Sequence, residues 1–269
     1  MNPQKLQRWA GKIAAFAIVP LYFIFLKYIQ RYRVRDIDRL RLQWRDMLQD
    51  HPGPWVICAN HLTMIDSLIL TYGLLSGHDH LRRYDRVPWN LPERANFQRH
   101  FILTFLCYLA KCIPISRGGD RDEMKKTLET CHELLAENNF LLIFPEGGRS
   151  RTGRINIENY SYGVGRFVVD NPDCRVLCVY LRGDRQETYS NFPPRGDCFT
   201  MMLKAFIPER IEVQGLRAQR HYAGQIIQQL SRMEEEYFAT HRQRHHRSEY
   251  AREPEEDRKS AVSQSRLHA

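Results

Sequence analysis

A histidine and an aspartate five residues apart, His61 and Asp66, are the pair in this sequence best suited to chemistry. They follow the apolar run Trp55–Ala59, which predicts a short buried strand, and Asp66 precedes a mostly apolar helical segment, 67–75. A carboxylate across such a turn can hold one ring nitrogen of the histidine while the other faces a cleft, which makes the imidazole a general base. The spacing is common by chance, so it needs support from a second feature.

A second stretch places glycines and charges at the end of another predicted strand. The apolar run 140–144 predicts a buried strand, and the sequence PEGGRSR follows it at residues 145–151. Backbone N–H groups near Gly147 and Gly148 can donate to a developing oxyanion. The guanidinium of Arg149 can bind a phosphate through forked hydrogen bonds.

Together, NHLTMID at residues 60–66 and FPEGGRSR at 144–151 resemble the first and third sequence blocks of the lysophospholipid acyltransferases, which include 1-acylglycerol-3-phosphate acyltransferase. The segments IPISR at 113–117 and VLCVY at 176–180 lie where the second and fourth blocks are expected. The resemblance covers about residues 50–185. It implies transfer of a fatty acyl group from acyl-CoA or acyl carrier protein to the free hydroxyl of a lysophospholipid, first of all 1-acylglycerol-3-phosphate.

The resemblance assigns roles to individual residues. His61 is the general base and Asp66 orients it, as in serine hydrolases, with the acceptor's own hydroxyl in place of the serine. Arg117 and Arg149 would bind the acceptor phosphate, and Glu146 would position Arg149 or an acceptor hydroxyl. The expected substrate-binding residues are Arg117, Glu146, Gly147, Gly148 and Arg149, with Asn60 and Ser150 in support. No metal or other cofactor is expected.

Departures from the family pattern leave the acceptor open. Gly148 stands where threonine is usual, so that one hydroxyl donor is missing, Cys178 stands where proline is usual, and Val87–Arg94 does not resemble the usual lysine-bearing stretch. Another amphiphilic acceptor, or a thioester hydrolase that activates water at the same site, is therefore an alternative. A non-catalytic membrane or nucleic-acid adaptor is a further alternative, but it leaves both motifs unexplained.

The surrounding elements predict one α/β domain with a largely parallel mixed sheet flanked by helices. Three consecutive elements predict a parallel crossover unit: strand 112–115, helix 121–138 with Asp120 as its N-cap, and strand 140–144. Sites in such sheets gather at the carboxyl ends of the strands, where His61, Arg117 and Glu146 stand. Further elements are expected at 32–50 (a strand and then a helix with Leu40, Leu42, Trp44 and Leu48 inward), 160–169, 175–181, 200–207 and 217–240. The polar connection 77–99 is expected near the site.

The N-terminal region is apolar and basic. Residues 13–29 are the longest apolar run, but 17 helical residues span only about 26 Å of a hydrocarbon core of about 30 Å, so a spanning and an interfacial helix both remain open. Residues 1–45 carry ten Lys and Arg against two Asp, which leaves the rest of the chain nearly neutral. This asymmetry predicts attraction to an anionic bilayer rather than to nucleic acid. The apolar segment 101–109 is expected to be a core helix or a second lipid contact.

The expected organisation has three parts. Residues 1–48 form a membrane-associated helical segment, 49–240 the acyltransferase domain, and 241–269 a disordered charged tail. If the apolar run spans the membrane, the excess of basic residues after it predicts a cytoplasmic main domain, so the enzyme is expected at the cytoplasmic face of the inner membrane, with membrane lipids as partners. Seven cysteines without a CxxC pair favour a reducing compartment over a disulfide framework.

Overall fold

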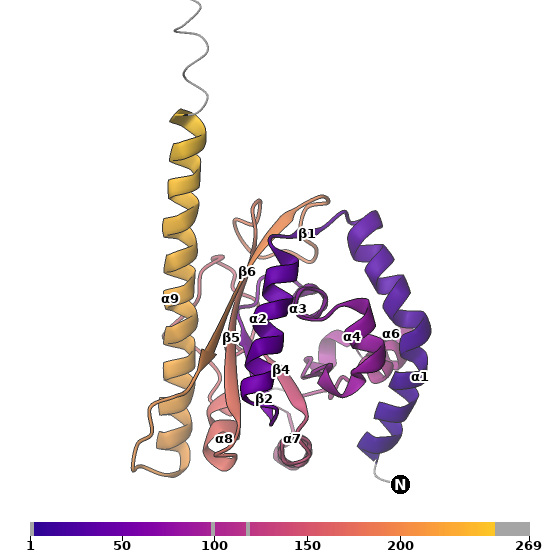
Figure 1. Cartoon of the computed structure of the whole chain (residues 1–269). Coiled ribbons are helices and arrows are strands. Elements are labelled where there is room, and N and C mark those ends of the chain that lie inside the picture. The colour runs from indigo at the N-terminus through magenta and orange to yellow at the C-terminus, as the bar shows by residue number, and fades with distance from the viewer. Residues whose placement is uncertain (1–2, 98–99, 117–118, 251–269) are drawn as a thin grey trace, which may run out of the picture. The chain divides into compact units, whose positions relative to one another are not determined.

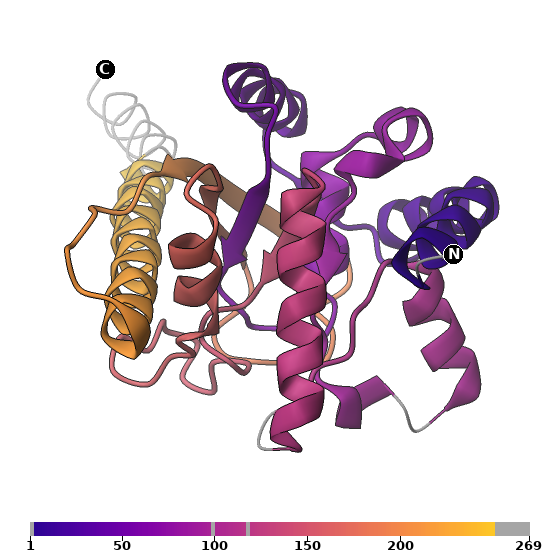
Figure 2. The ribbon, with the colours of Figure 1, turned by 90° about the horizontal axis from the view of Figure 1, so that it is seen from below.

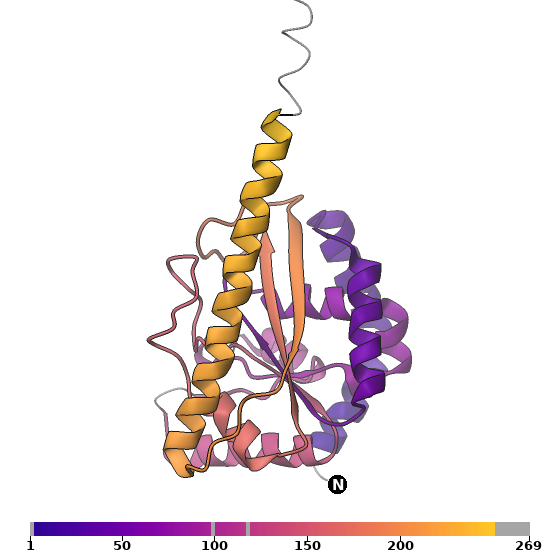
Figure 3. The same ribbon diagram turned by 60° about the vertical axis from the view of Figure 1, so that its left-hand side comes forward.

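A computed structural model of the chain describes residues 3–97, 100–116 and 119–250. Its sheet has six strands in the order β1-β6-β5-β2-β4-β3 (Figure 1). Neighbouring strands are parallel except for β5 and β6, which lie side by side in Figure 3 and run antiparallel. The α/β class with a largely parallel mixed sheet is thus confirmed. The strands are β1 (Arg33–Val34), β2 (Trp55–Ala59), β3 (Trp89–Asn90), β4 (Phe140–Ile143), β5 (Arg175–Gly183) and β6 (Cys198–Phe206).

Helices connect these strands. The chain divides into two compact units at Ser231, of which the first contains the sheet and the second begins within α9. The helices are α1 (Pro3–Ile24) with a π-helical turn at Phe25–Ile29, α2 (Ile37–Asp50), α3 (Asp66–Leu74), α4 (Gly77–Arg82), α5 (Arg94–Phe97), α6 (Phe101–Leu109), α7 (Arg121–Ala136), α8 (Gly163–Asp170) and α9 (Gly215–Tyr250), with a 3-10 turn at Tyr84–Arg86. α9 extends beyond its expected end at residue 240, and residues 251–269 of the expected tail lie outside the described residues.

The core lies on both faces of β2, whose five residues are all buried between β4 and β5. Trp55, Ile57 and Ala59 belong to the cluster covered by α2 and α3, and the alternating side chains point to the opposite face, where α7 and α8 lie (Figure 2). In α2, the indole of Trp44 packs edge-to-face on that of Trp55 at 5.2 Å between ring centroids. The expectation that Leu42 faces inward is wrong, because it lies half a turn away from the buried stripe of α2 and is exposed.

The predicted crossover unit is present except for its first strand. Residues 112–115 form only isolated bridges, Asn90 with Cys112 and Glu93 with Ile115, along the edge beyond the two-residue strand β3. Proline at position 114 has no N–H to donate to a ladder, which explains why no continuous strand forms there. The N-cap expectation is confirmed, since Asp120 Oδ1 accepts the N–H of Asp122 at 3.0 Å.

Two apolar helices lie outside the sheet and contact each other. The stretch Pro3–Ile29, α1 with its π-helical turn, is long and apolar enough to cross a membrane by length and composition. It packs against α4 and α6 through a stripe of small and polar residues: Gln7, Gly11, Ala15 and Val19. α6 buries none of its residues, so a core position for segment 101–109 is excluded.

His80 joins α4 to α1 and is buried. Its Nδ1 lies 2.9 Å from the carbonyl oxygen of Ser76, and its Nε2 lies 3.2 Å from the hydroxyl of Tyr22 on α1. Burial, with a smaller contribution from the Arg41 charge, lowers the pKa of His80 to about 4. In the unfolded chain His80 binds a proton near pH 6.5, whereas in the folded protein it binds one only near pH 4.

The free energy of unfolding should therefore fall as the pH drops from 6.5 to 4, by about 3 kcal/mol from His80 alone. Replacing His80 with Gln removes this titration, so the pH dependence between about pH 7 and 4.5 should become shallower in denaturant unfolding curves. The exposed neighbour His78 is the matched control, and His78→Gln should keep the wild-type slope. Equal slopes for wild type and His80→Gln would contradict the assignment.

Candidate active site

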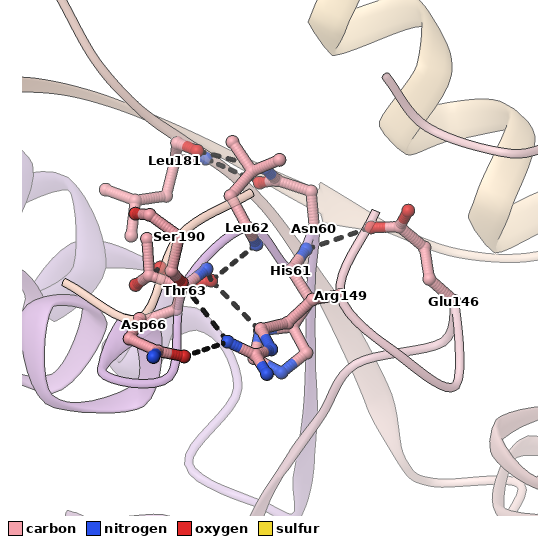
Figure 4. Close-up of polar contacts among 10 residues, drawn as sticks. Asn60, His61, Leu62, Thr63, Asp66, Glu146, Arg149, Leu181 and Ser190 are labelled. Carbon is pink, nitrogen blue, oxygen red and sulfur yellow. Dashed lines mark hydrogen bonds and ion pairs between the residues drawn. The ribbon is translucent and has the colours of Figure 1, made fainter. Parts of the chain in front are cut away.

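The candidate site begins where β2 ends. Asn60 is the first residue after the strand and is buried. Its side-chain amide donates to the carbonyl oxygen of Leu181 at 2.9 Å, and its Oδ1 accepts the Leu181 N–H at 2.7 Å (Figure 4). These two bonds join the end of β2 to β5 at the point where the ladder between them stops, and they set the direction in which the next residue leaves the sheet.

The carboxylate of Asp66 organises the turn after Asn60. It accepts the N–H groups of Leu62 and Thr63, each at 2.7 Å, and the hydroxyl of Thr63 (Figure 4). The Nδ1 atom of His61 lies 2.9 Å from Asp66 Oδ2. Because a carboxylate accepts, this contact places the ring proton on Nδ1 and leaves the lone pair of Nε2 for a proton from a substrate.

The loop after β4 meets His61 from the other side. The ring of His61 stacks on that of Phe144 at 4.0 Å between centroids, 18° from parallel. The Glu146 carboxylate accepts the His61 N–H at 2.9 Å, and the His61 carbonyl oxygen accepts the N–H of Ser150 at 2.8 Å. The histidine is therefore held by its ring, its N–H and its C=O at the same time, and two segments that are about eighty residues apart in sequence form one unit.

His61 and Arg149 line the same pocket, which has a volume of about 190 Å³. Its remaining wall comes from Met64 and Ser67 at the start of α3, from the loop after β4, and from the segment between Asn90 of β3 and Glu93 before α5. The expectation that connection 77–99 lies near the site is confirmed for these residues. Gly148 also lines the pocket, and a Cβ there would meet nothing within 4 Å. The pocket is thus open beside Gly148, and a side chain at this position would project into free space.

Arg149 is positioned by the connection between β5 and β6. One guanidinium nitrogen donates to the carbonyl oxygen of Ser190 at 3.2 Å and to Asn191 Oδ1 at 2.8 Å, and the group lies over the ring of Tyr189. The Gly147 N–H donates to the Phe144 carbonyl oxygen within the turn. Arg117 lies outside the described residues, so its place at the site stays a prediction.

A family model described as Acyltransferase matches residues 32–214 of this chain, and this range includes every residue of the pocket. The chain belongs to the acyltransferase family. Among curated proteins, N-acylphosphatidylethanolamine synthase of Arabidopsis thaliana is 25% identical over 208 residues, which cover 70% of this chain and 68% of that protein.

Two further residues of the candidate site are not among the expected site residues. Thr63 stands three residues before Asp66, with which an apolar helix begins, and its hydroxyl donates to the Asp66 carboxylate. A threonine three residues before an acidic residue is the sequence pattern of a capping box, so the local sequence indicates Thr63. The sequence predicts Phe144 only as the end of a strand, whereas its stacking on His61 depends on the pairing of β2 with β4. No local pattern predicts that contact.

Two other reactive side chains have structural roles. Cys58 is fully buried in β2, and burial raises the pKa of its thiol well above the ordinary value, which opposes a nucleophilic role. Asp79 accepts the hydroxyl of Ser76 at 2.5 Å as part of a capping box at the start of α4. Within the described residues, no group of three or more His, Cys, Asp or Glu side chains has the arrangement of a metal site.

Replacing Asn60 with Ala should destabilise the fold, because the N–H and C=O of Leu181 would both lose their partner in a buried place. We expect the free energy of unfolding to fall by about 2–4 kcal/mol, measured by denaturant titration. The exposed Asn159 is the matched control, and Asn159→Ala should stay within about 0.5 kcal/mol of wild type. Equal stabilities of the two variants would show that the Asn60 contacts contribute little.

Proposed function

We propose that this acyltransferase moves a fatty acyl group from a thioester, acyl-CoA or acyl carrier protein, to the free hydroxyl of a lysophospholipid, with 1-acylglycerol-3-phosphate as the favoured acceptor. The observation that carries the proposal is the pairing of His61 Nδ1 with Asp66 in a pocket that Arg149 also lines. A base and a phosphate-binding cation in one pocket suit an acceptor that has both a hydroxyl and a phosphate.

In the proposed reaction, Nε2 of His61 takes the proton of the acceptor hydroxyl while the oxygen attacks the thioester carbonyl carbon. The tetrahedral intermediate then collapses as the carbon–sulfur bond breaks, and the imidazolium returns the proton to the departing thiolate. Asp66 stabilises the imidazolium and keeps the ring in the reactive tautomer. No nucleophile of the enzyme is consumed.

The acceptor phosphate would bind at Arg149. Its contacts with Ser190 and Asn191 use one guanidinium nitrogen, so the remaining N–H groups can form forked hydrogen bonds with phosphate oxygens. Contact with the Tyr189 ring stabilises the cation in this orientation. With glycine at position 148, the pocket would admit a larger headgroup than it would with threonine there.

An acyl chain would enter an apolar cavity next to the pocket. This cavity has a volume of about 110 Å³, lies between α1 and α3, and is lined mainly by apolar side chains such as Ala15, Val19 and Leu68. Ser67 and Asn90 line both the cavity and the active-site pocket. A chain attached to a carbonyl near His61 could therefore extend beneath α1.

A second candidate acceptor is an amine. The name of the Arabidopsis relative describes the synthesis of an N-acylated phosphatidylethanolamine, and an amine requires the same proton removal as a hydroxyl. A panel of acceptors with one radiolabelled acyl thioester separates the candidates: lysophosphatidic acid, other lysophospholipids and phosphatidylethanolamine. Release of free fatty acid without acylation of any acceptor would favour a thioester hydrolase.

Replacing His61 with Ala should abolish acyl transfer without unfolding the protein, since the side chain is partly exposed to the pocket. Asp66→Asn should lower kcat by about 10⁴-fold, as the corresponding change does in a catalytic triad. Both are measured with the radiolabelled thioester, and circular dichroism reports folding. His78→Gln is the control and should keep wild-type turnover. Wild-type turnover in His61→Ala would remove the proposed base.

Replacing Arg149 with Ala should raise the KM for the phosphorylated acceptor by about tenfold or more, because a charge-assisted hydrogen bond to phosphate contributes about 1.5–3 kcal/mol. The KM for the thioester should change much less. Arg151→Ala is the control, since that side chain is exposed and does not line the pocket. Equal shifts in both KM values for Arg149→Ala would show that the residue does not recognise the acceptor phosphate.

A further inference from the structure

Two polar side chains lie where the active-site pocket meets the apolar cavity under α1. Ser67 and Asn90 line both spaces, whereas every other lining residue belongs to one space alone. In the proposed reaction, the acyl chain occupies the cavity and the acceptor oxygen approaches through the pocket that contains His61. The thioester carbonyl group joins the two, so it would lie at this junction, beside Ser67 and Asn90.

The backbone of Asn90 is fixed on both sides. Its N–H donates to the carbonyl oxygen of Lys111 at 2.9 Å, and its carbonyl oxygen accepts the N–H of Ile113 at 2.8 Å. The preceding residue, Trp89, is fully buried, and its indole N–H donates to Asn139 Oδ1 at 3.2 Å. The side chain of Asn90 therefore projects from a rigid part of the edge of the sheet.

The buried side chain of Lys111 holds the segment that leads to Asn90. Its Nζ donates to the carbonyl oxygens of Val87 at 2.6 Å and Tyr84 at 3.2 Å, and it lies 5.2 Å from the centre of the Trp89 ring. These contacts fasten residues 84–90 to the end of α6. A hydrogen-bond donor on a segment held in this way does not have to be reoriented during a reaction.

The side-chain amide of Asn90 is not satisfied within the protein. Its Oδ1 is buried and has no hydrogen-bond partner among the described residues, and its Nδ2 is accessible and donates to none of them. Most buried polar groups in proteins have a partner, so an exception at a pocket points to a ligand. Ser67 lies beside Asp66 in the first turn of α3, where the helix dipole favours negative charge.

A developing oxyanion needs such donors, because one of the expected backbone donors is already in use. The N–H of Gly147 donates to the carbonyl oxygen of Phe144 at 3.0 Å within the turn after β4. It would have to break that bond to reach a substrate. Side chains at the junction of pocket and cavity have no such bond to give up.

We propose that Asn90 and Ser67 are catalytic residues that bind the thioester carbonyl oxygen, Asn90 through its side-chain N–H and Ser67 through its hydroxyl. When the acceptor oxygen attacks, the electron pair of the C=O double bond moves onto that oxygen. Both donors stabilise the negative charge until the carbonyl re-forms and the carbon–sulfur bond breaks. The proton still moves through His61, and neither donor loses its own. This inference rests on the proposed function.

Replacing Asn90 with Ala should lower kcat by about 10²–10³-fold, as the loss of one oxyanion donor does in other enzymes, and should change the KM values much less. Asn90→Asp keeps the shape but accepts instead of donating, so its kcat should be at least as low. Ser67→Ala should lower kcat by about tenfold or more. Asn159→Ala, at an exposed asparagine, is the control and should keep wild-type kcat.

Circular dichroism and denaturant titration report whether these variants fold. Wild-type kcat in Asn90→Asp or in Ser67→Ala would overturn the role of that residue. A residue that only supports the fold would lower kcat in proportion to the loss of folded protein, and a fall of that kind would also overturn its role.

The carbonyl stretching band of a bound thioester tests the contact directly. Palmitoyl-CoA labelled with ¹³C at its carbonyl carbon is bound to His61→Ala, which should not turn it over, and infrared difference spectra are recorded. Donation from Asn90 lowers the frequency of this band, so adding Asn90→Ala should shift it back to a higher frequency. Adding Asn159→Ala should leave it in place. An unchanged band with Asn90→Ala would overturn the contact.

These experiments separate the inference from the proposed function. If wild type acylates an acceptor of the panel and Asn90→Asp and Ser67→Ala do so equally fast, the inference fails and the proposed function stands. If wild type acylates none of the acceptors, the proposed function fails, and the carbonyl band alone decides whether Asn90 binds a thioester. Failure of palmitoyl-CoA to bind to His61→Ala would overturn the inference as well.

Discussion

The structure of the site depends on the charge of one buried carboxylate. Asp66 is only 2% exposed, and a carboxylate in such a place is stable only when hydrogen bonds replace its lost water. Two peptide N–H groups, one hydroxyl and one imidazole supply them, all from His61, Leu62 and Thr63. The same contacts that stabilise the charge thus give the turn its shape. The position of the histidine ring is a consequence of satisfying that carboxylate.

The surrounding sheet makes this turn rigid. Asn60 joins it to β5, and the loop after β4 binds both backbone groups of His61 through Glu146 and Ser150. A general base works best when its ring does not have to be reoriented during the reaction. Glu146 contributes here by holding the histidine backbone, and its expected role of positioning Arg149 or an acceptor hydroxyl stays a prediction. The connection between β5 and β6 also positions Arg149.

The N-terminal helix α1 has apolar side chains on two sides. α1 covers the apolar cavity on one side and exposes Trp9, Ile13 and Phe16 on the other. A helix with two apolar sides needs two apolar partners, of which the catalytic domain supplies one.

The elements whose apolar pattern is local and strong are predictable from the amino-acid sequence. These features are the strands β2, β4 and β5, the capped helix α7 and the His61–Asp66 pair. Each depends on residues that are close together in sequence. Arg117 stays a prediction. The packing of distant segments decided that α6 is not in the core and that Phe144 supports the His61 ring. These outcomes depend on which distant segments pack together, and the free energy of such contacts is not a property of any short stretch of sequence.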